Sequence, residues 1–279
     1  MSMDVLNFSG IYEQESFYKD LEGARLVDLT AVAGTNCMCD DVAKEQLLKG
    51  MTSPEKGVND GCDCAPGIHF IDNGNYHYVS ALYLSRVKEP FSLVVLDHHP
   101  DMQRPMFDIL SCGGWICHVL DTNEYVRDVH VIGADEKLIS ELLPEDRERV
   151  KFYRVEEVFK EGESSLVLPE TQFPVYLSID KDVISRDELV TNWDQGEATR
   201  KQVLDFVKEL AQRESGRAFS GAFVKTENSG NGASEHEFVS GLLGIDICGE
   251  CAPDQEDCDL GSAIGGNDEF NGELLKLLT

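Results

Sequence analysis

One stretch of sequence decides how this chain is interpreted, namely Phe91-Ser92-Leu93-Val94-Val95-Leu96-Asp97-His98-His99-Pro100-Asp101. Its first six residues form a short apolar run, which is typical of a strand buried on both faces of a parallel sheet. Every second residue of an extended segment lies on the same face, so Asp97, His99 and Asp101 project together. Carboxylates and an imidazole directly after a buried strand predict a polar site at the end of that strand.

A second motif of the same kind follows another predicted strand, residues 174–179. Ser178-Ile179-Asp180-Lys181-Asp182 again places two carboxylates, Asp180 and Asp182, on one face. In open α/β sheets, ligands bind outside the carboxyl ends of the parallel strands. We therefore expect both motifs to meet in one crevice.

Four neighbouring carboxylates repel one another, and burial raises the cost of each charge. Two divalent cations would balance the four negative charges, and carboxylate with imidazole suits Mn²⁺, Fe²⁺ or Zn²⁺ better than Ca²⁺. A paired-metal site can hold a bridging water and present it as hydroxide. The alternative is that these aspartates only cap helices and turns, which one motif alone would favour and two motifs together disfavour.

The rest of the chain predicts a single α/β domain over residues 1–279, a three-layer α/β/α fold with a central, mostly parallel sheet. A polar segment, residues 226–237, is expected to be a surface loop, and residues 254–259 an acidic turn. The expected strands are residues 25–32, 67–71, 91–96, 129–132, 151–155, 174–179 and 241–247, and the expected helices are residues 41–49, 76–88, 134–143, 199–213 and 268–278.

Composition excludes several classes of function. The 279 residues include 24 Lys and Arg against 52 Asp and Glu, a net charge of −28, which would repel nucleic acid and an anionic membrane surface. No apolar run approaches the roughly 18 residues of a membrane span, and the N-terminal residues do not resemble a signal peptide. We therefore expect a cytoplasmic protein that binds neither nucleic acid nor membrane.

Nine cysteines, an odd number in a long chain, indicate a reducing compartment. Two C-x-C pairs, Cys37 with Cys39 and Cys62 with Cys64, and a group of three (Cys248, Cys251 and Cys258) raise the alternative of a structural zinc site. The C-x-C spacing fits a zinc ribbon poorly, which favours reduced thiols.

With these motifs, the chain resembles the ureohydrolase family of arginase, agmatinase and formiminoglutamase. The family's D-A-H-x-D motif is similar to residues 97–101, with His98 in place of Ala, and its S-[IF]-D-x-D motif to residues 178–182. Its G-G-D-H-S turn is similar to residues 74–80, and this similarity assigns His77 as a metal ligand. The resemblance spans residues 66–252 and implies an arginase-like fold, usually a homo-oligomer, with two Mn²⁺ ions bridged by Asp97 and Asp180. The implied ligands are His77, Asp97, His99, Asp101, Asp180 and Asp182.

The resemblance also suggests substrate contacts. The family ends a strand with a Glu that holds the substrate's guanidinium, which points to Glu250, with Asp246 second, although a capping or surface role for Glu250 is the alternative. Three loops, residues 102–115, 187–197 and 251–259, are expected to choose the substrate, with Gln103, Arg104 and Ser111 in the first and Asn192 and Trp193 in the second. Arg104 could pair with a carboxylate of the substrate.

Two departures separate this chain from arginases. The loop after the first motif lacks the family's proton-shuttle His, and His118 falls in an expected helix, where it is a poor substitute. The substrate loop, residues 190–199, differs in composition. A single-metal, histone-deacetylase-like site is disfavoured, because the second Asp of each motif is present.

These residues predict a hydrolase that cleaves a linear C–N bond of a guanidine, amidine or formimino group in a small, cationic substrate. In this hypothesis Asp101 relays a proton to the leaving amine and Glu250 holds the cationic end. Two alternatives stay open from the sequence. One is a non-catalytic metal-binding or regulatory protein on the same fold, and the other is hydrolysis of an amide.

Overall fold

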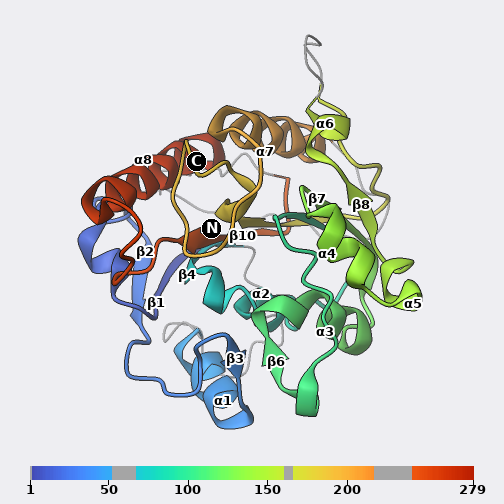
Figure 1. The fold of residues 1–279 in the computed structure, drawn as a ribbon, viewed down its shortest axis with the longest axis horizontal. Coiled ribbons are helices and arrows are strands. Elements are labelled where there is room, and N and C mark those ends of the chain that lie inside the picture. The colour runs from blue at the N-terminus through green and yellow to red at the C-terminus, as the bar shows by residue number, and fades with distance from the viewer. Residues whose placement is uncertain (1, 52–66, 160–165, 217–240) are drawn as a thin grey trace, which may run out of the picture.

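The fold is built on one sheet of eight parallel strands, in the order β2-β1-β4-β10-β9-β5-β7-β8 (Figure 1). The computed structural model describes residues 2–51, 67–159, 166–216 and 241–279. The strands are β1 Ser2–Asn7, β2 Ala24–Asp28, β4 Gly67–Asn73, β5 Phe91–Leu96, β7 Val126–Ile132, β8 Lys151–Tyr153, β9 Val175–Asp180 and β10 Gly244–Glu250. A separate antiparallel pair joins β3 Met38–Cys39 to β6 Leu110–Ser111.

Helices cover both faces of the sheet and give the three predicted layers. Figure 1 shows α7 and α8 together on one side of the strands and α2 and α3 on the other. The helices are α1 Asp41–Gly50, α2 Val79–Leu84, α3 Trp115–Thr122, α4 Glu136–Glu141, α5 Pro144–Arg147, α6 Val155–Val158, α7 Arg200–Ser215 and α8 Leu260–Leu278. The expected α/β/α fold with a parallel central sheet is confirmed.

Most predicted strands are present, and the apolar run 91–96 matches β5 at both ends. Strand β1 was not predicted, because polar Asp4 and Asn7 interrupt its apolar pattern. Asp4 is accommodated by the Arg25 guanidinium of the neighbouring strand β2, with an N–O distance of 2.8 Å. The predicted strand 25–32 ends at Asp28, whose carboxylate accepts the backbone N–H of Thr30 and turns the chain.

The predicted helices differ from the observed ones mainly at their ends. The expected helix 199–213 corresponds to α7, which begins one residue later because the Thr199 side chain caps it and accepts the backbone N–H of Gln202. Helix α8 starts at Leu260 rather than at residue 268, because burial of Ala263 and Ile264 outweighs the low helix propensity of the glycines around them. Residues 151–155 were expected to be one strand, but β8 ends at Tyr153 and Val155 begins α6. Helix α3 contains His118, for which a helix was expected without bounds, and α2 and α4 are shorter than residues 76–88 and 134–143.

Two apolar cores lie on the two faces of the sheet. One contains side chains of α7 and α8, among them Phe206 and Phe270, and the other contains side chains of α1, α2 and α3, among them Trp115. Both cores are close-packed and hold the strands in register. The carboxyl ends of the strands therefore form one rigid edge of the sheet.

Several sequence interpretations concern residues beyond these elements. Residues 254–259 form the expected turn, whereas the predicted loop 226–237, Cys62 and Cys64 lie outside the described residues. The seven cysteines in the described ranges are free thiols, and none of them belongs to a candidate metal-ligand group there. In the part of the chain that the structure describes, no helix has the length and apolar character needed to cross a membrane.

We expect the central strands to dominate stability. Leu177 of β9 is fully buried, so Leu177→Ala should lower the free energy of unfolding by roughly 2–5 kcal/mol through lost burial and a cavity. Leu26, on the edge strand β2, is 41% exposed, and Leu26→Ala is the matched control with an expected loss below about 1 kcal/mol. Chemical denaturation measures both variants, and equal losses would contradict this picture of the core.

Candidate metal centre

The two aspartate motifs meet because their strands are neighbours. Strands β5 and β9 pair in parallel with Leu96 opposite Ile179, so Asp97 and Asp180 reach the same edge of the sheet. The hydrogen bond from the backbone N–H of Asp97 to the carbonyl of Ile132 fixes the end of β5 on its other side. The predicted crevice at the carboxyl ends of the strands is therefore present.

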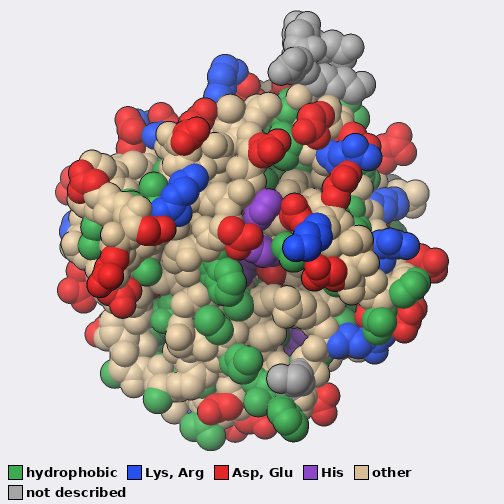
Figure 2. Space-filling view, in the orientation of Figure 1, with side chains coloured by type: hydrophobic (Ala, Val, Ile, Leu, Met, Phe, Trp, Pro, Cys, Tyr) green, Lys and Arg blue, Asp and Glu red, His purple; other side chains and the backbone are tan. Residues whose placement is uncertain are grey.

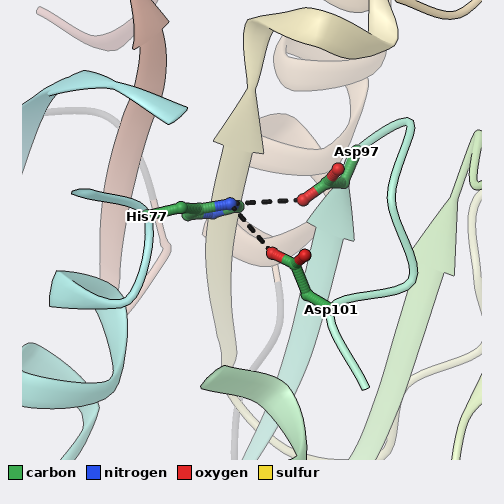
Figure 3. A group of neighbouring side chains, drawn as sticks. All are labelled: His77, Asp97 and Asp101. Carbon is green, nitrogen blue, oxygen red and sulfur yellow. Dashed lines mark ion pairs between the residues drawn. The ribbon is translucent and has the colours of Figure 1, made fainter. Parts of the chain in front are cut away.

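The first ligand group consists of His77, Asp97 and Asp101, drawn in Figure 3. His77 follows β4 and a short 3-10 helix, Gly74–Tyr76, and its Nδ1 points between the carboxylates. From Nδ1 the distance is 3.2 Å to Asp97 Oδ2, 3.3 Å to Asp101 Oδ2 and 3.3 Å to Asp180 Oδ2. One imidazole nitrogen thus faces three carboxylates.

The second ligand group consists of Asp97, His99 and Asp182, and it shares Asp97 with the first. His99 Nδ1 lies 2.8 Å from Asp182 Oδ2 and 3.6 Å from Asp97 Oδ1. The Asp182 carboxylate also accepts the backbone N–H of His98 at 2.9 Å, which ties the two motifs together. All six predicted ligand residues are therefore gathered in one place.

The donor set fits two divalent cations on its own chemistry. His77 Nδ1 and Asp97 Oδ2 are buried and make no hydrogen bond within the described residues, although they face each other. Buried polar atoms normally have a partner, so this pair marks a place where an ion would complete the contacts. Imidazole nitrogen with carboxylate oxygen, and no thiolate, suits a cation such as Mn²⁺.

The pKa values show how strongly the site needs positive charge. Burial is the main cause that raises the pKa of Asp101 to about 7, of Asp182 to about 7 and of Asp180 to about 8. Asp97 differs: burial favours its neutral form, but the close imidazoles of His77 and His99 outweigh burial and lower its pKa below the usual range. Asp97 is thus the carboxylate held ionised at the centre.

The same carboxylates raise the pKa values of the two imidazoles, because negative charge nearby favours the protonated ring. Burial alone would lower the pKa of each ring, but the carboxylates outweigh it. Asp101 and Asp97 raise the pKa of His77, and Asp182 and Asp97 raise that of His99. In the absence of an ion, protons therefore supply part of the positive charge that the carboxylates require.

Sequence reasoning missed the partners that orient these ligands. With the ring proton on Nε2, His77 donates to Ser178 Oγ at 2.9 Å, and His99 donates to the carboxylate of Asp194 at 3.1 Å. The indole N–H of Trp115 donates to Asp101 Oδ2 at 2.6 Å. Such outer contacts fix the tautomer and direction of metal ligands. Ser178 was visible in the motif, whereas nothing in the sequence pairs Trp115 or Asp194 with a ligand.

A cavity of about 640 Å³ opens onto the ligands. Of the predicted substrate residues, Gln103, Arg104, Ser111 and Trp193 line it. Asn192 does not; its side chain instead accepts the backbone N–H of Gly74 at 2.9 Å and anchors the substrate loop. Arg104 is held by Asp146 through two hydrogen bonds of 2.7 and 2.9 Å, so its guanidinium is already paired.

The structure corrects the predicted roles of Glu250 and Asp246, since neither lines the cavity. Gly249 has φ +95°, which breaks the extended alternation at the end of β10 and turns Glu250 towards α8. Asp246 lies on the other face, where it accepts hydrogen bonds from Tyr176 and pairs with His69 at 2.7 Å. His118 lines a separate, smaller cavity.

Glu250 instead forms a buried ion pair with Lys181, which stands between Asp180 and Asp182 in the second motif. The Lys181 ammonium lies 2.5 Å from Glu250 Oε1, both side chains are fully buried, and Asn271 of α8 bonds to both. Burial and the nearby Glu250 raise the pKa of Glu15 to about 10, so this second carboxyl stays protonated. Lys181 thus anchors the backbone that carries Asp180 and Asp182.

Breaking this pair should be costly. We expect Lys181→Met to lower the free energy of unfolding by roughly 3–5 kcal/mol, because Glu250 would be left as an uncompensated buried charge. Adding Glu250→Gln should recover a large part of that loss. Lys201→Met, at an exposed lysine of α7, is the matched control and should change stability by less than about 1 kcal/mol. A double variant as unstable as Lys181→Met alone would argue against the pair.

Known proteins resemble this chain in sequence to a limited extent. No protein-family model matches the chain. An uncharacterised protein from Thermotoga maritima is 27% identical over 252 residues, which cover 89% of this chain and 80% of that protein.

Solved structures share the fold at low identity. Formimidoylglutamase from Bacillus subtilis matches with a TM-score of 0.58 and 11% identity, covering 100% of this chain and 87% of that one. Proclavaminate amidino hydrolase from Streptomyces clavuligerus matches with a TM-score of 0.58 and 14% identity, and the match covers 99% of this chain and 91% of that one. A triple mutant of the Trypanosoma brucei arginase-like protein bound with Mn²⁺ matches with a TM-score of 0.53 and 14% identity, and the match covers 100% of this chain and 91% of that one. The chain therefore has the α/β fold of these formimidoylglutamase, amidino hydrolase and arginase-like structures.

Proposed function

We propose that this protein is a binuclear-metal hydrolase that cleaves a linear C–N bond of a guanidine, amidine, formimino or amide type. The observation that carries the proposal is the pair of His/Asp ligand groups that share Asp97 at the floor of a cavity. A site with a purely structural role would not need access from a cavity of this size. The name of one neighbouring structure denotes an amidino hydrolase and that of another a formimidoylglutamase, both acting on C–N groups of this kind.

Manganese is the cation that we propose. His77, Asp97, Asp101 and Asp180 would hold one ion, and Asp97, His99, Asp180 and Asp182 the other. One neighbouring structure is described as bound with Mn²⁺, which supports the choice. When bound, two such ions supply Lewis acidity and lower the pKa of a water molecule between them.

The side chains of this protein then have distinct tasks. Ser178 and Asp194 keep the imidazoles of His77 and His99 directed at the site. Asp101 lines the cavity, so it is placed to pass a proton to the leaving amine. Trp115 holds the Asp101 carboxylate in that position through its indole N–H.

Replacing the shared ligand tests the proposal. We expect the native protein, loaded with Mn²⁺ and freed of excess, to bind two ions per chain by elemental analysis. Asp97→Ala should lose both ions, since the two groups share this carboxylate, and hydrolysis of a guanidine panel should fall by at least about 100-fold. Asp20→Asn, at an exposed aspartate outside the ligand groups and the cavity lining, is the matched control and should keep both ions and the turnover of the native protein.

The outcomes separate hydrolase from binding protein. Two ions without turnover of any guanidine, amidine, formimino or amide compound would favour the non-catalytic alternative. No bound ion, or one unaffected by Asp97→Ala, would overturn the metal site itself. Circular dichroism of Asp97→Ala shows whether the fold persists.

Manganese affinity should rise with pH. Asp101 and Asp182, with pKa values of about 7, and Asp180, with about 8, hold protons in the free protein at pH 6 and release them by pH 8.5. An ion must displace those protons at low pH but not at high pH, so the affinity should increase at least about tenfold over this interval. Calorimetry in two buffers of different ionisation enthalpy measures the affinity and the protons released. An affinity independent of pH would contradict the assignment of these carboxyls as ligands.

A further inference from the structure

The cavity continues beyond the six ligand residues, and its outer wall is apolar. Met38 lies on one side, Leu138, Leu142 and Leu143 lie on another, and Trp193 lies near His99. The indole N–H of Trp193 donates to Asn75 Oδ1 at 2.9 Å, which fixes the ring in place. A molecule that fills the cavity next to the ligands would contact these side chains.

Three of these apolar side chains are exposed. Eight large hydrophobic residues in the described ranges are exposed, and three of them, Met38, Leu143 and Trp193, line this one cavity. Figure 2 shows hydrophobic side chains next to the histidines near the middle of this face. Exposed apolar surface gathered at a cavity is typical of a binding site for an apolar group.

The charges around the cavity favour a cation and disfavour an anion. Asp194, whose side chain is 72% exposed, and Glu141 both line it. Among the described lining residues Arg104 is the sole Lys or Arg, and Asp146 binds its guanidinium through two hydrogen bonds. A substrate carboxylate would therefore meet two acids and a cation that is already paired.

We infer that the substrate is a cationic guanidine or amidine whose remaining part is an apolar, uncharged alkyl or aryl group, selected by Met38, Leu143 and Trp193. This inference rests on the proposed function. For a guanidinium, water adds its oxygen to the central carbon, the bond from carbon to the substituted nitrogen breaks, and the protons of water go to the leaving amine. The products are urea and a protonated apolar amine, and no oxidant or reductant takes part.

Three probes of similar length isolate the preference. Pentylguanidine ends in a methyl group, agmatine in an ammonium group and guanidinobutyrate in a carboxylate. With the Mn²⁺-loaded protein, we expect kcat/KM for urea release from pentylguanidine to exceed that from guanidinobutyrate at least about tenfold, because the carboxylate of guanidinobutyrate would meet two acids and an arginine that is already paired. Calorimetry should give the same order of affinities.

Variants of the wall link the preference to residues. Leu143→Ser should lower kcat/KM for pentylguanidine about fivefold, because a half-exposed leucine contributes only part of the transfer free energy of a buried one. Val167→Ser is the matched control, since Val167 is 44% exposed against 49% for Leu143 but lies outside the cavity lining. Leu143→Arg should shift the preference towards guanidinobutyrate by supplying an unpaired cation.

The two proposals fail in different ways. Urea release from all three probes without preference, or an unchanged preference in Leu143→Arg, would overturn the inference and leave the hydrolase intact. Selective binding of pentylguanidine without urea release from any probe would overturn the proposed hydrolase and leave the selectivity of the cavity. Absence of binding of every probe would overturn the inference.

Discussion

Electrostatic repulsion among four carboxylates at the ends of two adjacent strands is the constraint on which this structure depends. Pairing of β5 with β9 brings Asp97 and Asp180 to one edge, and burial removes the water that would screen them. The protein offsets this repulsion in two ways. Two imidazoles face the carboxylates, three of the four aspartates have raised pKa values, and Asp97 alone is held ionised between both histidines. A pair of divalent cations would satisfy the same requirement without protons.

This constraint explains why the ligand set was visible in the sequence. Apolar runs of six residues followed by alternating Asp and His have few uses other than a site at a strand end, and β5 matches its predicted bounds. Parallel packing then requires the two motifs to converge, whatever the loops do. His77 was less evident, since its assignment came from resemblance rather than from a pattern of its own, yet it faces Asp97 and Asp101.

Features that depend on single backbone angles or on distant partners could not be predicted. Alternation alone places Glu250 on the face of Cys248, but the positive φ of Gly249 turns it to the opposite side. Trp115, at the start of α3, and Asp194, in a loop, contact the ligands, and no pattern in the sequence links either residue to the motifs. Strand β1 and the first turns of α8 carry weak local signals and are stabilised by tertiary contacts, a balance that local propensity does not contain.

The position of Glu250 has a consequence for recognition. In the family that the sequence resembles, a strand-end Glu holds the guanidinium, whereas here the corresponding carboxylate neutralises Lys181 beneath the second motif. Lys181 needs that partner, because an unpaired ammonium buried under α8 would be far costlier than the pair. The carboxylate therefore cannot serve both the lysine and a substrate. Contacts with the cationic substrate that we propose would come from the cavity instead, which Asp194 and Glu141 line together with apolar side chains.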